Sequence, residues 1–386
     1  MASYNRENIS YMVVRGYREA RRHERNNPTH LDFEHNLESN LSRLAYELDK
    51  RIWKPQPCTC FIIEEPTKRE VFAPSFRDRI VSHVLYSLVS PIFERTFIDD
   101  SFSCRKGKGT LHGIERLEHH IRSESENYQK EVYALSMDIE GYFLNIDKKI
   151  LFDEIYRILE KAKEKKEFKD LDYDFIYYLI KAQLENSPSE NCIKVSPDKA
   201  WEDFPMRKSL FNSPKGVGLA IGDIMSQLYS NVYLNILDQY IKRELKAKHY
   251  CRYVDDFKII SGDKKYLEFC KEKIRIFLEG RLGLILHRKK TKITSCNENL
   301  MFLGACIRNG RKYVPKKTLA RINSKMNEFR NMNPIDILPI ANSYFGYLSQ
   351  FKAVKIKKRL FDKYIAPFGL FINRKNFDSI CFIECN

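Results

Sequence analysis

The spacing of apolar residues along the chain predicts helices interspersed with short strands. Apolar residues recur at helical spacing through residues 1–50 and again from residue 222 to residue 242. Between these segments, residues 52–74 contain two β-type runs that are bounded by prolines and separated by a polar turn. The pattern therefore predicts a mixed fold in which a small hairpin precedes a long amphipathic helix capped by Asp223.

The segment from His249 to Ser261 predicts a β-hairpin with two carboxylates at its tip. Apolar, β-forming residues flank Asp255 and Asp256 on both sides, which favours two strands joined by a tight turn. Adjacent carboxylates repel each other, so they are stable when they are solvated, when one is protonated, or when they hold a cation. A solvated turn is the simplest interpretation of the dipeptide alone, and other residues are needed to favour a metal site.

A third carboxylate follows another predicted strand. Residues 132–147 begin with an apolar run that ends at Asp138 and continue into a turn with two aromatic residues. A site with two divalent cations would require such a carboxylate opposite the hairpin that carries Asp255 and Asp256. The three aspartates are therefore the candidate catalytic groups of this chain.

The net charge indicates a polyanionic partner. The 386 residues include 67 Lys and Arg against 51 Asp and Glu, which gives a formal charge of +16. About +10 of that excess lies in residues 311–386, which contain 15 basic and 5 acidic residues. A solvated helix surface is the alternative interpretation of this lysine-rich segment, but the imbalance favours contact with phosphates.

The cysteine spacing argues against a zinc site, and the lack of long apolar runs argues against a secreted or membrane protein. The ten cysteines are mostly single, and none forms the paired C-x-x-C spacing of a zinc site. The sequence shows neither an apolar signal core near its start nor a run of about 18 apolar residues. We therefore expect reduced thiols, no membrane association and a cytoplasmic location.

Two basic segments are candidates for binding phosphates. Arg77 and Arg79 lie in the predicted first turn of a helix, where positive side chains oppose the helix dipole and favour an external anion. A later loop interleaves three glycines with Arg105, Lys106 and Lys108, so its backbone can approach phosphates closely. Its spacing is not that of a Walker A loop.

Residues 187–216 form a polar segment that contains prolines. Trp201 and Phe211 within it are expected to anchor the segment against the body of the protein. Its length is typical of a functional loop and equally of a tolerated insertion.

Together these elements resemble the reverse transcriptases. The elements that match in order are a basic fingers hairpin, Asp138, the helix from Gly222 to Asp238, Tyr253-Val-Asp-Asp256, Lys290-Thr291 and Phe302-Leu303-Gly304. The resemblance implies an α+β, right-hand polymerase fold with fingers, a palm of antiparallel sheet plus helices, and a helical thumb. The implied domains are N-terminal basic helices (1–51), fingers (52–131), a palm (132–300) with an insertion loop at 187–216, a primer-grip hairpin (301–314) and a basic thumb (315–386).

Local motifs narrow the resemblance to the reverse transcriptases of diversity-generating retroelements. Intron and retroviral relatives typically begin the palm helix with Gln-Gly and continue, three residues later, with Ser-Pro. This chain has Ile221-Gly222-Asp-Ile-Met-Ser226-Gln227 instead, and its segments 97–110 and 201–211 also resemble that subfamily. In that subfamily, Leu-Pro usually precedes Ile-Gly. This chain has Gly218-Leu-Ala-Ile-Gly instead, and the difference affects the loop above the nascent base pair.

The resemblance implies nucleotidyl transfer, in which a primer 3′-hydroxyl attacks the α-phosphate of a deoxynucleoside triphosphate and pyrophosphate leaves. It implies two Mg²⁺ ions about 3.5–4 Å apart, with Mn²⁺ as an alternative ion. The residues assigned to catalysis are Asp138, Asp255, Asp256 and Lys290. The residues assigned to the metal ions are Asp138, Ile139, Asp255 and Asp256.

The remaining assignments concern substrates. Phe143 is implied to be the steric gate against a ribose 2′-hydroxyl, with an ordinary core aromatic as its alternative role, and Lys289 and Lys292 compete with Lys290 for the pyrophosphate. The residues assigned to the incoming nucleotide are Lys68, Arg69, Phe143, Ile221, Gly222 and Gln227. The residues assigned to nucleic acid are Arg77, Arg79, Arg105, Lys106, Lys108, Phe302, Leu303, Gly304, Lys316 and Lys317.

The family resemblance implies that a template-repeat RNA is copied into cDNA with errors at template adenines, the process called mutagenic retrohoming. Low fidelity is inferred from Ile221, which lacks the hydrogen-bonding side chain that Gln supplies in relatives. The implied partners are that RNA, its duplex with cDNA, deoxynucleotides and an oligomeric accessory variability protein, in a bacterial or phage-encoded system. The alternatives are a defence-associated or group II intron-like reverse transcriptase and a non-catalytic RNA-binding scaffold.

Overall fold

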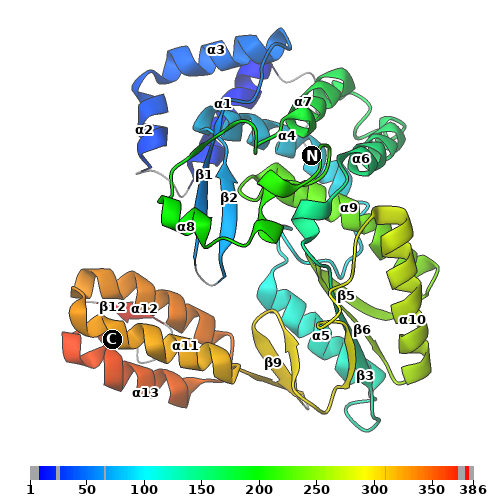
Figure 1. Cartoon of the computed structure of the whole chain (residues 1–386), viewed down its shortest axis with the longest axis vertical. Helices are drawn as coiled ribbons and strands as arrows, with labels where there is room; N and C mark the ends of the chain where they lie inside the picture. Colours follow the sequence, from blue (N-terminus) through cyan, green and yellow to red (C-terminus); the bar gives the residue numbers. More distant parts are fainter. Residues whose placement is uncertain (1–7, 23–26, 65–66, 309, 373–378, 382–386) are drawn as a thin grey trace. The chain divides into compact units, whose positions relative to one another are not determined.

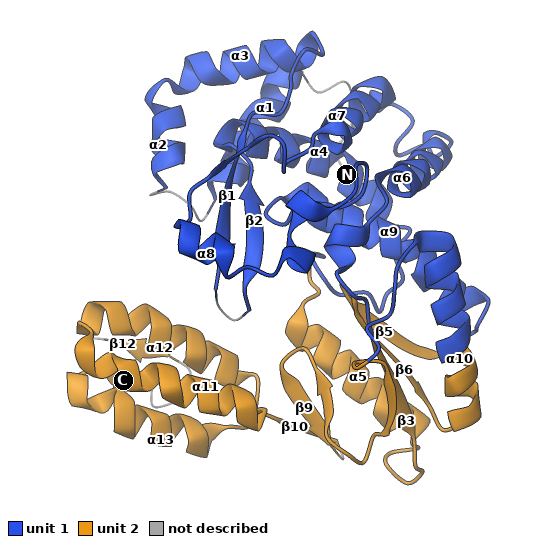
Figure 2. Cartoon of the chain, viewed as in Figure 1, with its two compact units in different colours: residues 1–105, 138–247, 271–288 blue, residues 106–137, 248–270, 289–386 orange. Residues whose placement is uncertain are grey.

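The chain, described by a computed structural model, divides into two compact units (Figure 2). Unit 1 comprises residues 1–105, 138–247 and 271–288, and unit 2 comprises residues 106–137, 248–270 and 289–386. The structure describes all residues except 1–7, 23–26, 65–66, 309, 373–378 and 382–386. Parts of the predicted N-terminal helices and of the predicted thumb therefore lie outside the described residues.

Helices at the start of the chain pack together in unit 1 (Figure 1). They are α1 (Ile9–Arg21), α2 (Pro28–His35), α3 (Leu37–Asp49) and α4 (Phe76–Glu94). The side chains of Asn8 and Asn27 accept hydrogen bonds from first-turn amides and so cap α1 and α2. α1 lies close against α4 at Gly16, where a Cβ would come within 2.8 Å of the Ile80 carbonyl oxygen.

The predicted fingers hairpin is confirmed in unit 1, and a third strand extends it. The strands are β1 (Cys58–Ile63), β2 (Arg69–Ala73) and β4 (Cys192–Lys194). β1 pairs antiparallel with β2 and parallel with β4, in the order β2-β1-β4. The insertion therefore contributes a strand, together with the short helix α8 (Asp198–Glu202). Three residues are too few to show an alternating pattern, so the sequence analysis did not predict β4.

The insertion is anchored to the fingers sheet by buried contacts. Glu70 on β2 is buried, and its carboxylate accepts hydrogen bonds from Ser209 Oγ at 2.8 Å and from the Leu210 amide at 2.7 Å. Trp201 and Phe211 form an edge-to-face pair, as expected of residues that anchor this segment. The insertion is thus part of the packed structure of unit 1.

The rest of unit 1 is a group of helices around α9 (Ile224–Arg243), namely α4, α6 (Lys148–Lys163) and α7 (Tyr173–Glu185). α9 was predicted to bury one face, and Leu228 and Val232 on that face are buried. Asn231 and Asp238 on other faces are buried as well, because α4 and α6 cover α9 from further sides. The Asn231 side chain donates a hydrogen bond to the Ser103 carbonyl at 2.8 Å, which makes its burial tolerable.

Unit 2 contains a four-stranded sheet in the order β5-β6-β3-β7 (Figure 1). Its strands are β3 (Tyr133–Asp138), β5 (His249–Tyr253), β6 (Asp256–Ser261) and β7 (Lys292–Ser295). Helix α5 (Thr110–Glu124) packs against β5, and α10 (Lys264–Phe277) follows β6. β3 ends at Asp138, where the chain passes from unit 2 into unit 1.

The C-terminal segment of unit 2, residues 289–386, contains a small sheet and a helical bundle. The small sheet has β8 (Leu300–Phe302), β9 (Ala305–Arg308) and β10 (Arg311–Tyr313), and the helices are α11 (Lys316–Asn327), α12 (Pro334–Ser349) and α13 (Val354–Tyr364). The short strands β11 (Phe371–Ile372) and β12 (Ile380–Cys381) follow the helices. Met326, Phe329, Phe345 and Leu360 share one buried core, so these helices form a bundle.

Candidate active site

The Asp-Asp hairpin has the geometry that the sequence predicts. β5 and β6 pair antiparallel, with Tyr253 opposite Asp256, so Val254 and Asp255 form the two-residue turn. Val254 has φ 54°, a left-handed conformation that a β-branched residue adopts only when the surroundings enforce it. The fully buried Arg252 donates a hydrogen bond to the Val254 carbonyl at 3.0 Å and so supports the turn.

The third aspartate ends the neighbouring strand of the same sheet. Asp138 is the last residue of β3, Asp256 is the first residue of β6, and β3 and β6 are adjacent in the sheet order. The amide of His287 donates a hydrogen bond to the Asp138 carbonyl at 2.7 Å, and the adjoining Ile139 is buried. The strand that carries Asp138 is therefore held at its end by main-chain contacts.

Lys258 is a buried cation next to the hairpin, and the sequence reasoning missed it. Its Nζ lies 2.7 Å from Asp256 Oδ1 and 5.2 Å from the centre of the Phe302 ring. Only 4% of this residue is exposed. Asp256 and Lys258 are two residues apart on β6 and therefore share a face of the strand. A lysine between the apolar residues Phe257 and Ile259 was the available signal.

Phe143 lies in a segment that is joined to the loop before α9. It belongs to a short 3-10 helix (Tyr142–Asn145) that follows Gly141, a residue with φ 57°. The Leu219 amide donates a hydrogen bond to the Phe143 carbonyl at 2.8 Å. Phe143 is half-buried, so part of its ring is exposed for contact with a ligand.

The Ile221–Gly222 loop lies against β2 of the fingers sheet. The Phe72 amide donates a hydrogen bond to the Ile221 carbonyl at 2.8 Å. Gly222 has φ 134°, and a Cβ there would lie 2.5 Å from the Phe72 carbonyl oxygen, so only glycine fits. Gln227 is exposed in the first turn of α9. Unit 1 thus joins this loop directly to the hairpin that bears the predicted triphosphate contacts.

The cations predicted to bind the triphosphate lie at the tip of that hairpin. Arg69 begins β2 and is exposed, whereas Lys68 is half-buried with its Nζ 4.0 Å from an Asp203 carboxylate oxygen. An ion pair near the surface at this distance adds little stability, so Lys68 can exchange Asp203 for a phosphate.

Arg77 differs from the prediction of a nucleic-acid contact. Its guanidinium forms ion pairs with Glu47 and, at 3.2 Å, with Asp78, and only 16% of its side chain is exposed. Burial lowers the pKa of Arg77, and the neighbouring carboxylates already balance its charge. Arg77 thus has anionic partners within unit 1, and its contact with nucleic acid stays a prediction. Arg79, two residues later, is half-buried with its guanidinium 3.5 Å from a His30 ring nitrogen.

Arg105 also has an internal role in place of the predicted contact with phosphate. Its guanidinium donates hydrogen bonds to Glu94 at 2.8 Å and to the carbonyls of Ile98 and Ser101 at 2.7 Å each. It lies over the Phe97 ring and is buried. These four contacts lock the turn after α4, so Arg105 stabilises the loop and its guanidinium faces inward.

The other predicted nucleic-acid contacts are arranged in unit 2. Lys106, Lys316 and Lys317 are exposed, and Lys108 is half-buried. Phe302 is buried, whereas Leu303 and Gly304 have positive φ angles of 49° and 80° and form the turn from β8 to β9. Tyr347 of α12 donates a hydrogen bond to the Gly304 carbonyl at 2.7 Å. Lys289 and Lys292 are exposed like Lys290, so exposure does not single out one lysine for the pyrophosphate.

Carboxylate oxygens are the ligands that Mg²⁺ prefers, so the three aspartates fit the expected ions by donor type. Within the described ranges, the structure shows no ready-made cluster of three or more His, Cys, Asp or Glu side chains arranged to hold a metal ion. Of the helices that the structure describes, none combines the length and the apolar character needed to span a bilayer.

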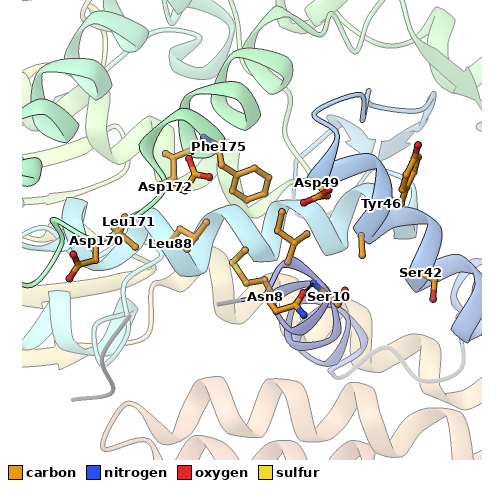
Figure 3. Close-up of a pocket in the computed structure, with 14 residues that line it drawn as sticks. Asn8, Ser10, Ser42, Tyr46, Asp49, Leu88, Asp170, Leu171, Asp172 and Phe175 are labelled. Carbon is orange, nitrogen blue, oxygen red and sulfur yellow. Dashed lines mark hydrogen bonds between the residues drawn. The ribbon is translucent and has the colours of Figure 1, made fainter. Parts of the chain in front are cut away.

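A pocket of about 630 Å³ lies elsewhere in unit 1, among α1, α3, α4 and the start of α7 (Figure 3). Apolar side chains such as Leu88 and Phe175 form part of its wall, and Asp49, Asp170 and Asp172 lie around them. None of the residues predicted for catalysis lines this pocket.

The family of the chain follows from comparison with known proteins. The sequence profile of the family described as reverse transcriptase (RNA-dependent DNA polymerase) matches residues 63–307. Since this match covers more than half of the 386 residues, the chain belongs to the reverse transcriptase family. The enzyme class is that of the RNA-directed DNA polymerases.

Individual relatives agree with this family. Protein YkfC of Escherichia coli (strain K12) is 26% identical over 321 residues, which cover 74% of this chain and 76% of YkfC. The group II intron-encoded protein LtrA of Lactococcus lactis subsp. cremoris is 23% identical over 347 residues, which cover 73% of this chain and 52% of LtrA. The chain therefore spans about half the length of LtrA.

A solved structure confirms the predicted fold class. The structure of apo telomerase from Candida tropicalis matches with a TM-score of 0.50 at 12% identity and covers 82% of this chain and 59% of that chain. Together with the family match, this similarity confirms the α+β right-hand polymerase fold.

Proposed function

We propose that this chain copies a template-repeat RNA into cDNA for a diversity-generating retroelement, with errors concentrated at template adenines. The main support is the Tyr253–Asp256 hairpin, which lies next to the strand that ends at Asp138 in one sheet. The second support is the sequence Ile221-Gly222 with Ser226-Gln227 at the start of α9. The first feature supports polymerisation in general, and the second supports the subfamily.

In the proposed reaction, Asp138, Asp255 and Asp256, with the Ile139 main chain, would hold two Mg²⁺ ions. When bound, these ions activate the primer 3′-hydroxyl and stabilise the oxygens of the leaving pyrophosphate. The Lys258 ammonium keeps Asp256 in one position through their ion pair.

Unit 1 supplies the groups that would bind the incoming deoxynucleotide. Lys68 and Arg69 neutralise its triphosphate, and Phe143 excludes a ribose 2′-hydroxyl by its bulk. Ile221 presents an apolar side chain beside the nascent base pair, and this side chain can neither donate nor accept a hydrogen bond. A mismatched pair therefore meets less resistance than it would beside a glutamine.

The proposed partners follow from the same subfamily. They are a structured RNA that carries the template repeat, its duplex with cDNA and an oligomeric accessory protein. The exposed lysines at the start of α11 are suited to the duplex because they lie on a segment with a large excess of positive charge. A group II intron-like enzyme is the second candidate, favoured by the similarity to LtrA.

Primer extension on an RNA template, followed by sequencing of the products, tests this proposal. We expect Mg²⁺-dependent cDNA synthesis with substitutions concentrated at template adenines, and loss of synthesis in the Asp255→Asn variant. The Ile221→Gln variant is expected to make fewer such errors at a similar rate. Faithful synthesis by the unmodified protein would favour the intron-like candidate. RNA binding without synthesis, with accessory protein and cognate RNA both supplied, would favour a non-catalytic scaffold.

A further inference from the structure

A chain of hydrogen bonds crosses the interior of unit 1 and ends beside the Ile221–Gly222 loop. We name it the buried relay, and its members are Tyr229 on α9, Gln183 on α7, Ser82 on α4 and Asp223 at the N-cap of α9. Each member comes from a different element or turn, so no local sequence pattern predicts their contact. Asp223 directly follows Gly222, so the last link fixes the residue next to the loop.

The hydrogen bonds of the relay all point toward the carboxylate. The Tyr229 hydroxyl donates to Gln183 Oε1 at 3.1 Å, and Gln183 Nε2 donates to Ser82 Oγ at 3.2 Å. Ser82 Oγ then donates to Asp223 Oδ2 at 3.1 Å. Ser82 and Tyr229 are buried, so each of these groups relies on a protein partner in place of bulk water.

Asp223 is used for this long-range contact and not for the local role that its position suggests. An aspartate at an N-cap usually accepts a hydrogen bond from an amide of the first helical turn. Here the carboxylate forms no cap hydrogen bond with a first-turn amide. Those amides still lie near enough to stabilise the charged form of the carboxylate. Its hydrogen bond to Ser82 ties the start of α9 to α4.

The other side of the loop is fixed by β2. The Phe72 amide holds the Ile221 carbonyl, and the Phe72 carbonyl lies so close that position 222 must be glycine. The loop is therefore held between a main-chain contact on one side and the relay on the other. If the relay is lost, only the main-chain contact with β2 still holds the loop.

We propose that Asp223 is a positioning residue which, through the buried relay, fixes the Ile221–Gly222 loop and thereby sets how strongly the enzyme discriminates against incorrect nucleotides. This inference rests on the proposed function, because that function places the loop beside the nascent base pair. A loop held at both sides resists the displacement that a mismatched pair requires. Neither Asp223 nor the other members of the relay touches the reacting atoms.

Variants of the relay are expected to fold, because a cavity of about 90 Å³ lies beside it. Ser82, Gln183, Asp223 and Tyr229 all line this cavity, together with the polar side chains of Asp78 and Lys148. A cavity of this size can hold water next to these polar side chains, and the water can take over a hydrogen bond when one member is removed. The loop then loses a fixed partner without leaving a buried polar group unpaired.

The test is single-nucleotide insertion on an RNA template, with correct and incorrect deoxynucleotides, in variants that remove one hydroxyl each. We expect Ser82→Ala and Tyr229→Phe to raise KM for the correct nucleotide about threefold to tenfold and to lower the ratio of correct to incorrect insertion by a similar factor. kcat for the correct nucleotide should change less than KM. Asp223→Asn keeps an oxygen acceptor and should resemble the unmodified enzyme more than Asp223→Ala does.

Tyr173→Phe is the matched control. Tyr173 is also a buried tyrosine of unit 1, and its hydroxyl donates a hydrogen bond to the Phe168 carbonyl at 3.2 Å, away from the relay. Its removal should leave KM and the insertion ratio unchanged. Equal effects of Tyr229→Phe and Tyr173→Phe on both quantities would overturn the inference.

A double variant shows whether Ser82 and Asp223 act through the same hydrogen bond or impair the enzyme independently. Ser82→Ala with Asp223→Ala should be no worse than either change alone, because both remove the same link. Additive losses would show that the two residues act independently and would overturn the relay. If the unmodified enzyme fails to extend primers on RNA, the proposed function fails; if it extends them and the relay variants match the control, only this inference fails.

Discussion

At the scale of single residues, the environment of each charged side chain decides what that side chain can do. Arg77 and Arg105 have internal carboxylate or carbonyl partners, whereas Arg69 and Lys106 are exposed. A charged side chain that already has internal partners binds a ligand weakly, because the ligand must first displace those partners. The same reasoning applies to Asp256 of the hairpin, whose carboxylate forms an ion pair with Lys258.

We predict that Asp255→Asn impairs primer extension far more than Asp256→Asn does. Lys258 already balances the charge of Asp256 and engages one of its carboxylate oxygens at 2.7 Å. We expect a loss in kcat on the order of 100-fold or more for Asp255→Asn and on the order of tenfold for Asp256→Asn. Circular dichroism melts of both variants serve as the folding control. Equal losses would mean that the ion pair with Lys258 does not make the Asp256 carboxylate less important for synthesis than that of Asp255.

We predict that the stability of unit 1 depends on the protonation of Asp223. Burial raises the pKa of Asp223 from its ordinary value of 3.8 to about 6, and the hydrogen bond from Ser82 opposes this rise only in part. Between about pH 4 and pH 6 the folded state therefore binds more protons than the unfolded state. The stability that protonated Asp223 contributes is fully present below pH 4 and is lost as the pH rises through 6.

Replacing Asp223 with Asn measures this contribution. The free energy of unfolding of Asp223→Asn should equal that of the unmodified protein near pH 4 and exceed it by on the order of 2–3 kcal/mol at pH 8. The titratable and charged neighbours of Asp223 are Glu19 and Arg22 of the α1 region, Arg79 and His83 of α4, and Tyr229 of α9. Burial lowers the pKa of His83, which has the opposite effect on stability, but this effect is common to both proteins and cancels in their difference. A difference that is the same at pH 4 and pH 8 would contradict the prediction.

At the scale of elements, short main-chain contacts place the candidate nucleotide site. The loop before α9 is bonded to β2, and the segment that carries Phe143 is bonded to the same loop through Leu219. The insertion is likewise bonded to β2, through Glu70. Hydrogen bonds to the fingers sheet therefore hold three separate segments of unit 1, directly or through the loop before α9. The contacts of β2 with the loop and with the insertion can each be tested.

We predict that Gly222→Ala weakens nucleotide binding, whereas Gly216→Ala has a small effect. Both glycines have positive φ, but a Cβ at 222 would lie 2.5 Å from the Phe72 carbonyl oxygen, and a Cβ at 216 would meet nothing within 4 Å. Gly216→Ala should lose about 1 kcal/mol of stability from backbone strain alone. Gly222→Ala must in addition move the loop, so its KM for deoxynucleotides should rise by about tenfold or more. Equal KM values for the two variants would contradict the close contact at Gly222.

We predict that Glu70→Ala loosens the insertion without unfolding the rest of unit 1. The Glu70 carboxylate is buried and holds both Ser209 and the Leu210 amide, and burial raises its pKa. Limited proteolysis should therefore cleave the variant faster within residues 187–216 than the unmodified protein. Glu185→Ala, which removes an exposed carboxylate before the insertion, is the control. Unchanged cleavage in Glu70→Ala would show that other contacts suffice to anchor the segment.

At the scale of the whole molecule, the positive charge is the property most directly related to the polyanionic substrate. The excess of +16 is concentrated toward the end of the chain, where the described part of unit 2 carries the helices α11 to α13. Lysines with exposed ammonium groups bind phosphates at the expense of bound counterions, so salt weakens such binding.

We predict that Lys316→Gln with Lys317→Gln reduces the salt dependence of RNA binding. Both lysines are exposed in the first turn of α11, where no acidic residue is present. If both contact phosphates, the slope of log K against log salt concentration should become less steep by up to about 1.4 for single-stranded RNA. Lys165→Gln with Lys166→Gln changes two other exposed lysines and should leave the slope unchanged. The same slope in both double variants would remove α11 from the RNA interface.

The sequence by itself determined the elements whose pattern is local. The alternation around Asp255 and Asp256 predicted the hairpin, the apolar run before Asp138 predicted its strand, and the order of the motifs predicted the right-hand fold. These predictions succeeded because turn chemistry, strand periodicity and helix periodicity depend on residues that are neighbours in the chain.

Only the tertiary structure decided which polar groups lie together and which are buried. The sequence around Arg105 predicts a basic side chain on a loop, but its guanidinium faces inward. Lys258 is a single lysine in a strand by sequence, but its ammonium forms an ion pair with Asp256. The relay from Tyr229 to Asp223 joins three helices, and β4 pairs with a strand more than 100 residues earlier in the chain. Burial and hydrogen bonding between distant segments depend on the packing of the whole unit, and a local pattern of residue types carries no information about them.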